Sequence, residues 1–152
     1  MKTWSLERLS FQASDSGVTL RSIGDGAYEV NLVDTAAPTA PTGWSAWINI
    51  VVVPADMLSS IPEAVRMTMF KGTYMGAGPA EKKATRSIMG QSIEGDAQQG
   101  TIPRPCHLEA FLAPLPDGGA LFFGTRVVDG FASDVAEAFF AQVAASITVA
   151  PE

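Results

Sequence analysis

Apolar and polar residues alternate with the two-residue period of a β-strand along several short parts of the chain. The most informative of these is residues 44–53, where nearly every position is apolar. One face of this strand would carry Ala46, Ile48, Ile50 and Val52, and the other would carry Trp47, Val51 and Val53 beside Asn49. A strand that is apolar on both faces has to be covered on both sides. The cover would come either from layers of the fold or from a partner, and we expect a central antiparallel sheet that contains this strand.

Other strands are predicted before and after this central one, separated by residues typical of turns. Asp25-Gly26 is typical of a hairpin turn, and the run Pro116-Asp117-Gly118-Gly119 is a second strong turn signal. The predicted strands are residues 3–11, 18–20, 28–33, 84–89, 92–97, 105–112 and 120–128, with a short final strand at 147–149.

Two segments have the period of a helix instead. In the first, Leu58, Val65, Met69 and Gly72 recur near helical spacing, and Met67, Phe70 and Tyr74 widen this expected buried stripe. Ser59 or Ser60 would cap its start, with Pro62 in the first turn. A second helix is expected from Ser133, and its apolar face would carry Val135, Phe139, Phe140, Val143 and Ile147. The order of elements predicts one α+β domain over residues 1–152, an antiparallel sheet packed with two main helices.

This order of elements resembles the PsbP-like sandwich fold. The local likeness lies in Ile88-Met89-Gly90-Gln91, in the segment from Phe111-Leu112 to Pro116-Asp117-Gly118-Gly119, and in residues 139–149. Some cytosolic bacterial members of that fold are chaperones that hold hydrophobic segments of type VI secretion effectors. The resemblance implies a similar sandwich and a chaperone-like role. It carries over no functional residue, and it has no counterpart for Trp44, Trp47 or the Pro/Thr-rich residues 35–43.

Composition narrows the classes of partner. The net charge of −6 argues against nucleic acid and anionic membranes, which are bound through basic surface. No apolar run approaches the length of a membrane-spanning helix or a signal peptide, so we expect a cytoplasmic protein. Hydrophobic residues make up 47% and charged residues 17% of the chain. This imbalance favours a protein partner or a homodimer to cover surplus apolar surface.

Cys106 and His107 are the only residues of their kinds in the chain and are adjacent. Neighbours on a strand point to opposite faces, so a strand here would separate a thiol nucleophile from its base. Cys106 would then join Leu108 and Ala110 on an apolar face as a small buried side chain. We expect no catalytic residue, no metal site and no cofactor.

Glu94 and Asp96 alternate on a predicted strand and would share a face. Such a pair can bind a hard cation or act as acid and base, but a solvated strand face is the more common outcome. A small-molecule binding domain or an enzyme that uses Glu94, Asp96 or His107 in a pocket is the alternative function.

The main functional hypothesis is a non-enzymatic protein-binding or chaperone-like module that accepts a hydrophobic protein segment. Trp44 and Trp47 are the candidate partner-binding residues, as interface anchors if they are exposed and as core if they are not. The methionines are likewise adaptable contacts at a surface and filling in a core.

Overall fold

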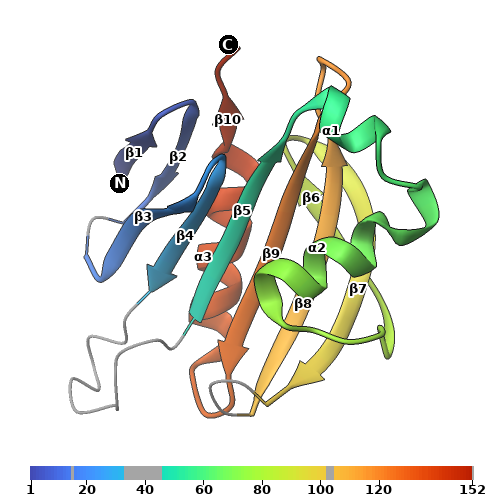
Figure 1. The fold of residues 1–152 in the computed structure, drawn as a ribbon. Coiled ribbons are helices and arrows are strands. Elements are labelled where there is room, and N and C mark those ends of the chain that lie inside the picture. Colours follow the sequence, from blue (N-terminus) through green and yellow to red (C-terminus); the bar gives the residue numbers. More distant parts are fainter. Residues whose placement is uncertain (15, 33–45, 102–104, 152) are drawn as a thin grey trace.

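The computed structural model describes residues 1–14, 16–32, 46–101 and 105–151, which form two antiparallel sheets and the helices around them (Figure 1). The smaller sheet has the order β1-β2-β10 and the larger one the order β3-β4-β5-β9-β8-β7-β6. The strands are β1 (Lys2–Leu6), β2 (Leu9–Ala13), β3 (Val18–Gly24), β4 (Ala27–Leu32), β5 (Ala46–Val53), β6 (Lys82–Ile88), β7 (Gln91–Gly100), β8 (Cys106–Pro114), β9 (Ala120–Val128) and β10 (Thr148–Val149). The helices are α1 (Ala55–Ser59), the 3-10 turn η1 (Glu63–Val65), α2 (Arg66–Met75) and α3 (Ser133–Ser146). The predicted α+β class with an antiparallel sheet is confirmed.

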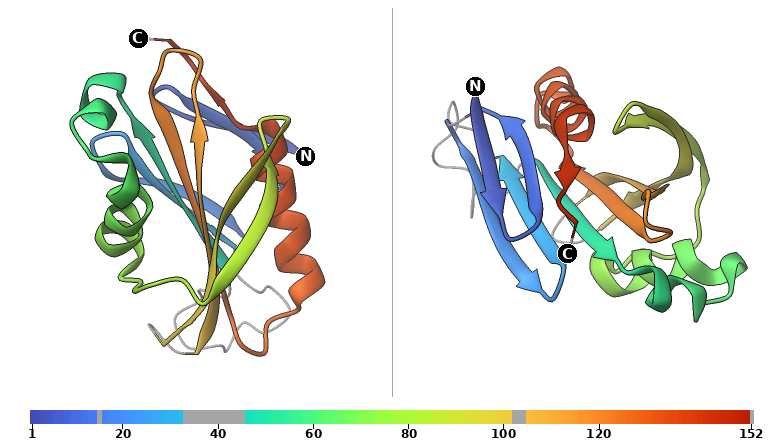
Figure 2. Two further views of the ribbon diagram at one scale, coloured as in Figure 1. Left: turned by 90° about the vertical axis from the view of Figure 1, so that its right-hand side faces the viewer. Right: turned by 90° about the horizontal axis from the view of Figure 1, so that it is seen from above.

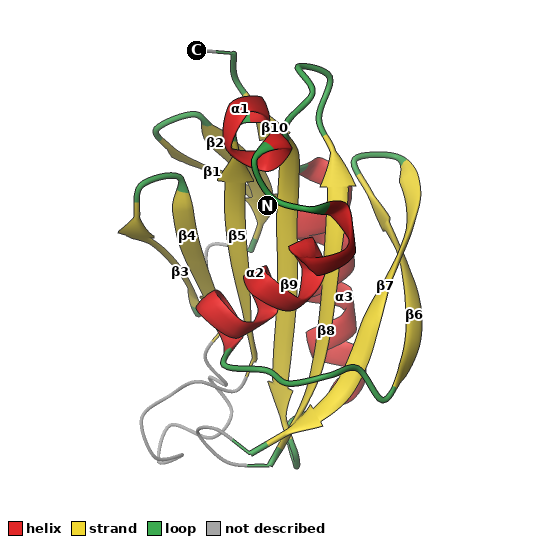
Figure 3. Cartoon of the chain, turned by 45° about the vertical axis from the view of Figure 1, so that its right-hand side comes forward, coloured by secondary structure: helices red, strands yellow, loops and turns green. Residues whose placement is uncertain are grey.

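The chain crosses the larger sheet twice, once on each face. After β5 it passes through α1 and α2, which crosses in front of β5, β9 and β8 (Figure 3). It then enters the sheet at its far edge as β6 and returns by a meander to place β9 beside β5. Helix α3 packs on the opposite face from α2, on the same side as the β1–β2 hairpin (Figure 2).

Each face of the larger sheet has its own apolar core. On the α3 side, Phe139 and Val143 pack with Ile50, Leu121 and Phe11. On the α2 side, Phe70 and Met75 pack with Phe122 and other residues of β5, β8 and β9. The predicted packing of Ile50, Leu121 and Phe139 in one core is confirmed, because all three are buried.

Every residue of β5 is buried within this single chain. The strand is apolar on both faces because α3 and the small sheet cover one face and α1 and α2 cover the other. A second copy of the chain is not needed to cover it, which removes the main sequence argument for a homodimer.

Two details of the predicted elements were wrong. The expected first strand is a hairpin, because the chain turns at Glu7, whose φ of 53° is left-handed. The expected single helix is three pieces, and its expected buried stripe is right only in part. Leu58 and Phe70 are buried as expected, but Val65 and Met69 are exposed, and Lys71 and Met75 are buried although they lie outside the expected stripe.

Candidate functional site

The three polar residues singled out from the sequence do not come together. Glu94 is exposed on β7, and Asp96 points to the α2 face, where it binds the Lys71 ammonium at 2.9 Å and the Lys83 ammonium at 3.4 Å. His107 lies on the opposite face of the sheet, because it neighbours Cys106 of the α2-side core. Within the described residues, no group of three or more His, Cys, Asp or Glu side chains is arranged to hold a metal ion.

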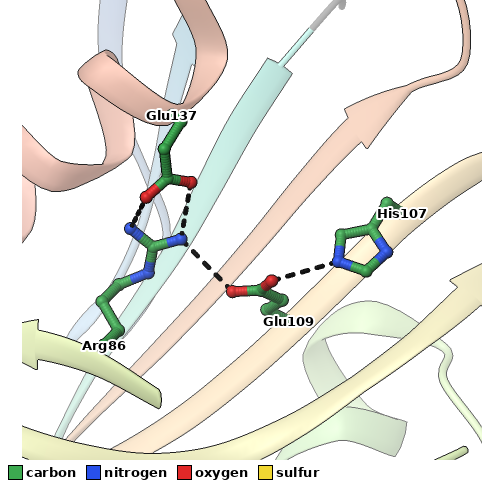
Figure 4. A network of polar contacts seen from close by, with 4 residues as sticks. All are labelled: Arg86, His107, Glu109 and Glu137. Atoms are coloured by element: carbon green, nitrogen blue, oxygen red, sulfur yellow. Dashed lines mark hydrogen bonds and ion pairs between the residues drawn. The ribbon is translucent and has the colours of Figure 1, made fainter. Parts of the chain in front are cut away.

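His107 belongs to a polar network that joins strands β6 and β8 to α3 (Figure 4). Its Nε2 is 3.1 Å from Glu109 Oε2, and the other oxygen of Glu109 accepts from Arg86 at 3.2 Å. The Arg86 guanidinium also donates to both oxygens of Glu137 on α3, at 2.9 and 3.1 Å. A bidentate arginine–carboxylate pair fixes geometry as well as charge. The network therefore fastens α3 to β6 and β8, and neither cavity described below is lined by any of its residues.

Cys106 is fully buried beside Leu108 and Ala110, as its strand position predicts. Burial raises the pKa of the Cys106 thiol above its ordinary value. The thiolate is the reactive form, so a raised pKa makes the side chain inert at neutral pH.

We expect Cys106 to stay unmodified when the native protein is treated with Ellman's reagent, and to react fully once guanidinium unfolds the chain. Cys106→Ser is expected to lower the free energy of unfolding by about 1 kcal/mol, because a hydroxyl is costlier to bury than a thiol. Rapid labelling of the native protein would contradict the structural role.

Trp47 does not meet the condition set for an interface anchor. Its side chain is 2% exposed and packs in the α2-side core, with the Arg126 guanidinium 4.9 Å from its ring centre. Trp44 and the Pro/Thr-rich stretch at 35–43 lie outside the described residues.

A cleft of about 360 Å³ lies at the end of the larger sheet where two hairpin turns approach the helices. We call it the turn–helix cleft. Its walls come from the β1–β2 turn, the β3–β4 turn, the end of β5, α1 and α2, all at the upper end or front of the view in Figure 1. The described residues that line it are Glu7, Arg8, Asp25, Gly26, Tyr28, Val51, Val52, Pro54, Asp56, Met57, Phe70 and Tyr74.

One side of the turn–helix cleft is apolar and adaptable. Phe70 and Tyr74 stack at a centroid distance of 6.4 Å, and both rings pack on Phe122 of the sheet. Met57 of α1 lines the same cleft and keeps 52% of its surface exposed. Two fixed rings beside a flexible thioether form a wall that can accommodate apolar side chains of different shapes.

The charged groups of the cleft come from the turns. Glu7, Asp25 and Asp56 contribute three carboxylates against the single guanidinium of Arg8. Arg8 Nε donates to the carbonyl of Ala150 at 2.7 Å, which holds the C-terminal segment beside this turn. The rim of the cleft is therefore predominantly negative.

Tyr28 is 2% exposed, and its hydroxyl donates to Glu7 Oε2 at 2.9 Å. Burial, with the hydrogen bond to Glu7, raises the pKa of Tyr28 from 10.0 to about 12. The phenol therefore stays protonated at neutral pH and serves as a hydrogen-bond donor in the wall of the cleft.

This pKa predicts a loss of stability in alkali. The unfolded chain loses its tyrosine proton near pH 10 and the folded chain near pH 12. Stability from this group is therefore complete below pH 10 and falls as the pH rises toward 12. In an ultraviolet titration of the native protein, a late tyrosinate step near pH 12 should be present and should disappear in Tyr28→Phe. A late step that survives this substitution would show that the group is not Tyr28.

The residues of the cleft were not identified from the sequence. Met57 was noted only as one methionine among several, and Glu7, Asp25 and Tyr28 lie in three segments with no common motif. Arg126 could have been noticed in the sequence, because it is a charged residue inside the otherwise apolar strand β9.

Comparison with known proteins gives a fold but no function. No family model matches the chain, and no curated protein is significantly similar to it. A 1.50 Å crystal structure of a protein from Bacteroides thetaiotaomicron is similar, with a TM-score of 0.54 and 12% identity. The similarity covers 99% of this chain and 49% of the other, so this chain spans about half the length of that protein. Among the described helices, none has the length and apolar character to cross a bilayer.

Proposed function

We propose that this protein is a non-enzymatic binding module that receives an apolar side chain of a partner protein segment in the turn–helix cleft. The observation that carries the proposal is Met57, a half-exposed side chain that lines a cleft of about 360 Å³ together with a stacked pair of aromatic rings. Exposed apolar groups that converge on a concavity are a common feature of binding sites.

The charge of the rim specifies the partner further. Three carboxylates and one guanidinium surround the apolar wall, in a protein of net charge −6. A partner segment with lysine or arginine on either side of its apolar residue complements this rim. An acidic segment is repelled by it.

The alternative, a pocket built on Glu94, Asp96 or His107, has less support. Asp96 and His107 lie on opposite faces of the sheet, and none of the three lines either cavity. The hydrogen-bonded Tyr28 does not supply a base, because its pKa near 12 keeps it protonated.

Peptide binding tests the proposal. Labelled peptides with a central leucine or phenylalanine, flanked by either lysines or glutamates, would be titrated with the protein and followed by fluorescence anisotropy. We expect the lysine-flanked peptides to bind and the glutamate-flanked ones not to. Met57→Ser should weaken binding about tenfold or more, because it removes the apolar side chain of the wall and leaves the charge of the rim unchanged.

Val135→Ser is the matched control, because Val135 is similarly exposed, at 49%, but lies on α3 on the opposite face of the sheet. It should leave peptide affinity unchanged. Equal losses in both variants, or equal binding of both peptide sets, would rule out the turn–helix cleft as the docking site.

A chaperone role linked to bacterial secretion and a cytoplasmic location extend this proposal, with the PsbP-like resemblance as their support. A homodimer is also compatible with it, although β5 needs no second copy for burial. Sedimentation equilibrium over a range of concentrations tests the dimer: a species that stays near 16.0 kDa is a monomer.

A further inference from the structure

Arg126 is a buried cation without an ion pair to any described residue. It is 9% exposed, and Trp47 covers one side of its guanidinium. Its Nη2 donates to the carbonyl of Met75 at the end of α2, and its Nε is buried with no hydrogen-bond partner in the described chain. Burial lowers the pKa of Arg126, although Cys106 and Glu29 act in the opposite direction.

A cavity of about 190 Å³ adjoins this side chain. We call it the Arg126 cavity. It lies between the end of α2 and the strands β7, β8 and β9, where Arg126, Gln98 and Leu108 sit in one cross-strand row. Gln99 and Thr101 at the end of β7, with Gly78 after α2, complete its polar lining. Amide and hydroxyl groups around a fixed guanidinium are the composition of an anion site.

The neighbouring charges are already matched to one another. Lys71 is paired with Asp96 at 2.9 Å, and Glu29 is paired with Arg21 at 2.9 Å and accepts from Asn31 at 3.1 Å. One unmatched positive charge therefore faces the cavity. This single positive charge suits a ligand with a single negative charge. A doubly charged phosphate would leave one uncompensated negative charge near the carboxylates of Glu29 and Asp96.

We infer that the Arg126 cavity binds a small carboxylate anion, with Arg126 as its counter-ion and Gln98 and Thr101 as hydrogen-bonding groups. The Met75 carbonyl and the Trp47 ring fix the guanidinium in place, so the ligand does not have to order it. The volume admits an acid of a few carbon atoms, because a water molecule occupies about 30 Å³ of liquid. The cavity is separate from the turn–helix cleft, and the inference stands without the proposed function.

Nuclear magnetic resonance of the ¹⁵N-labelled full chain tests this inference directly. Acetate, glycolate and inorganic phosphate would each be titrated while the Trp47 indole, the Arg126 Nε–H and the amides of Gly100 and Thr101 are followed. Acetate and glycolate should shift these signals saturably, and phosphate should do so at least tenfold more weakly. A short peptide would also be titrated, once with a free C-terminal carboxylate and once with an amidated C-terminus. Binding of the free-carboxylate peptide alone would identify a chain end as the source of the ligand, and binding of neither peptide would identify a free acid.

Arg126→Met should abolish the saturable shifts, whereas Lys82→Gln, which removes an exposed charge on β6, should leave them unchanged. If Arg126→Met does not fold, Thr101→Val serves instead, because Thr101 is exposed, and it should weaken binding severalfold. The inference is overturned if no acid gives saturable shifts at any concentration that leaves the protein folded, or if phosphate binds as well as acetate. It is also overturned if folded Arg126→Met, or Thr101→Val, binds like the wild type.

Discussion

Gly95→Ala is expected to lower the free energy of unfolding by about 3 kcal/mol or more, the cost of a steric clash that a packed core cannot relax. Gly95 lies in the middle of β7. A Cβ there would stand 2.1 Å from the carbonyl oxygen of Ala110 and 2.6 Å from the Phe111 ring. Both obstacles belong to the neighbouring strand β8, and one of them is backbone. The strands would have to separate locally to admit a methyl group.

Gly72→Ala is the control for this effect. Gly72 lies in α2, and a Cβ at this position meets no atom within 4 Å. Alanine should therefore stabilise the protein by about 0.5–1 kcal/mol, through helix propensity and a less flexible unfolded chain. Urea unfolding of the two variants and the wild type measures both changes. A loss below about 1 kcal/mol in Gly95→Ala would mean that β7 and β8 are looser than the packing of Phe111 indicates.

The central strands and α3 could be predicted because burial alone determines their sequences. Residues of β5 are apolar on both faces, and that pattern has one structural explanation, a strand covered on both sides. Phe139, Phe140 and Val143 of α3 are buried as their helical spacing predicts. For these elements the local pattern and the tertiary environment agree.

The orientation of α2 could not be predicted because a charged residue occupies its buried face. Hydrophobic periodicity assigns Lys71 to solvent and Val65 and Met69 to the core. In the structure Lys71 is 2% exposed, since its ammonium reaches Asp96 on β7, twenty-five positions later in the chain. An ion pair between distant segments leaves no periodic trace in the sequence.

The two cavities escaped prediction for a related reason. The turn–helix cleft is assembled from two turns, a strand end and two helices. These segments do not form a common sequence motif. Asp96 was noticed as a carboxylate, but its role depends on Lys71 and Gln98, which the fold brings to it. A single polar residue inside an apolar strand, such as Arg126, is a signal that is visible in the sequence before the structure is known.

The ion pair under α2 gives the second large effect. Asp96→Asn is expected to destabilise the protein by about 3 kcal/mol, because it leaves the buried Lys71 ammonium with only the Gln98 oxygen, 2.9 Å away. Lys71→Met should cost less. The Asp96 carboxylate is 14% exposed and would still have the Lys83 ammonium at 3.4 Å, so its charge would keep an ion-pair partner.

A double-mutant cycle measured by urea unfolding decides whether this asymmetry arises from the pair. In Lys71→Met/Asp96→Asn no buried charge remains, and the methionine stem occupies the space of the lysine stem between α2 and β8. The double variant should therefore be more stable than Asp96→Asn alone, with a coupling energy of about 1–3 kcal/mol between the two sites. Strictly additive losses would show that the two charges do not stabilise the fold through each other. A larger loss in Lys71→Met than in Asp96→Asn would contradict the expected asymmetry, because it would mean that the Asp96 carboxylate is the costlier charge to leave without its partner.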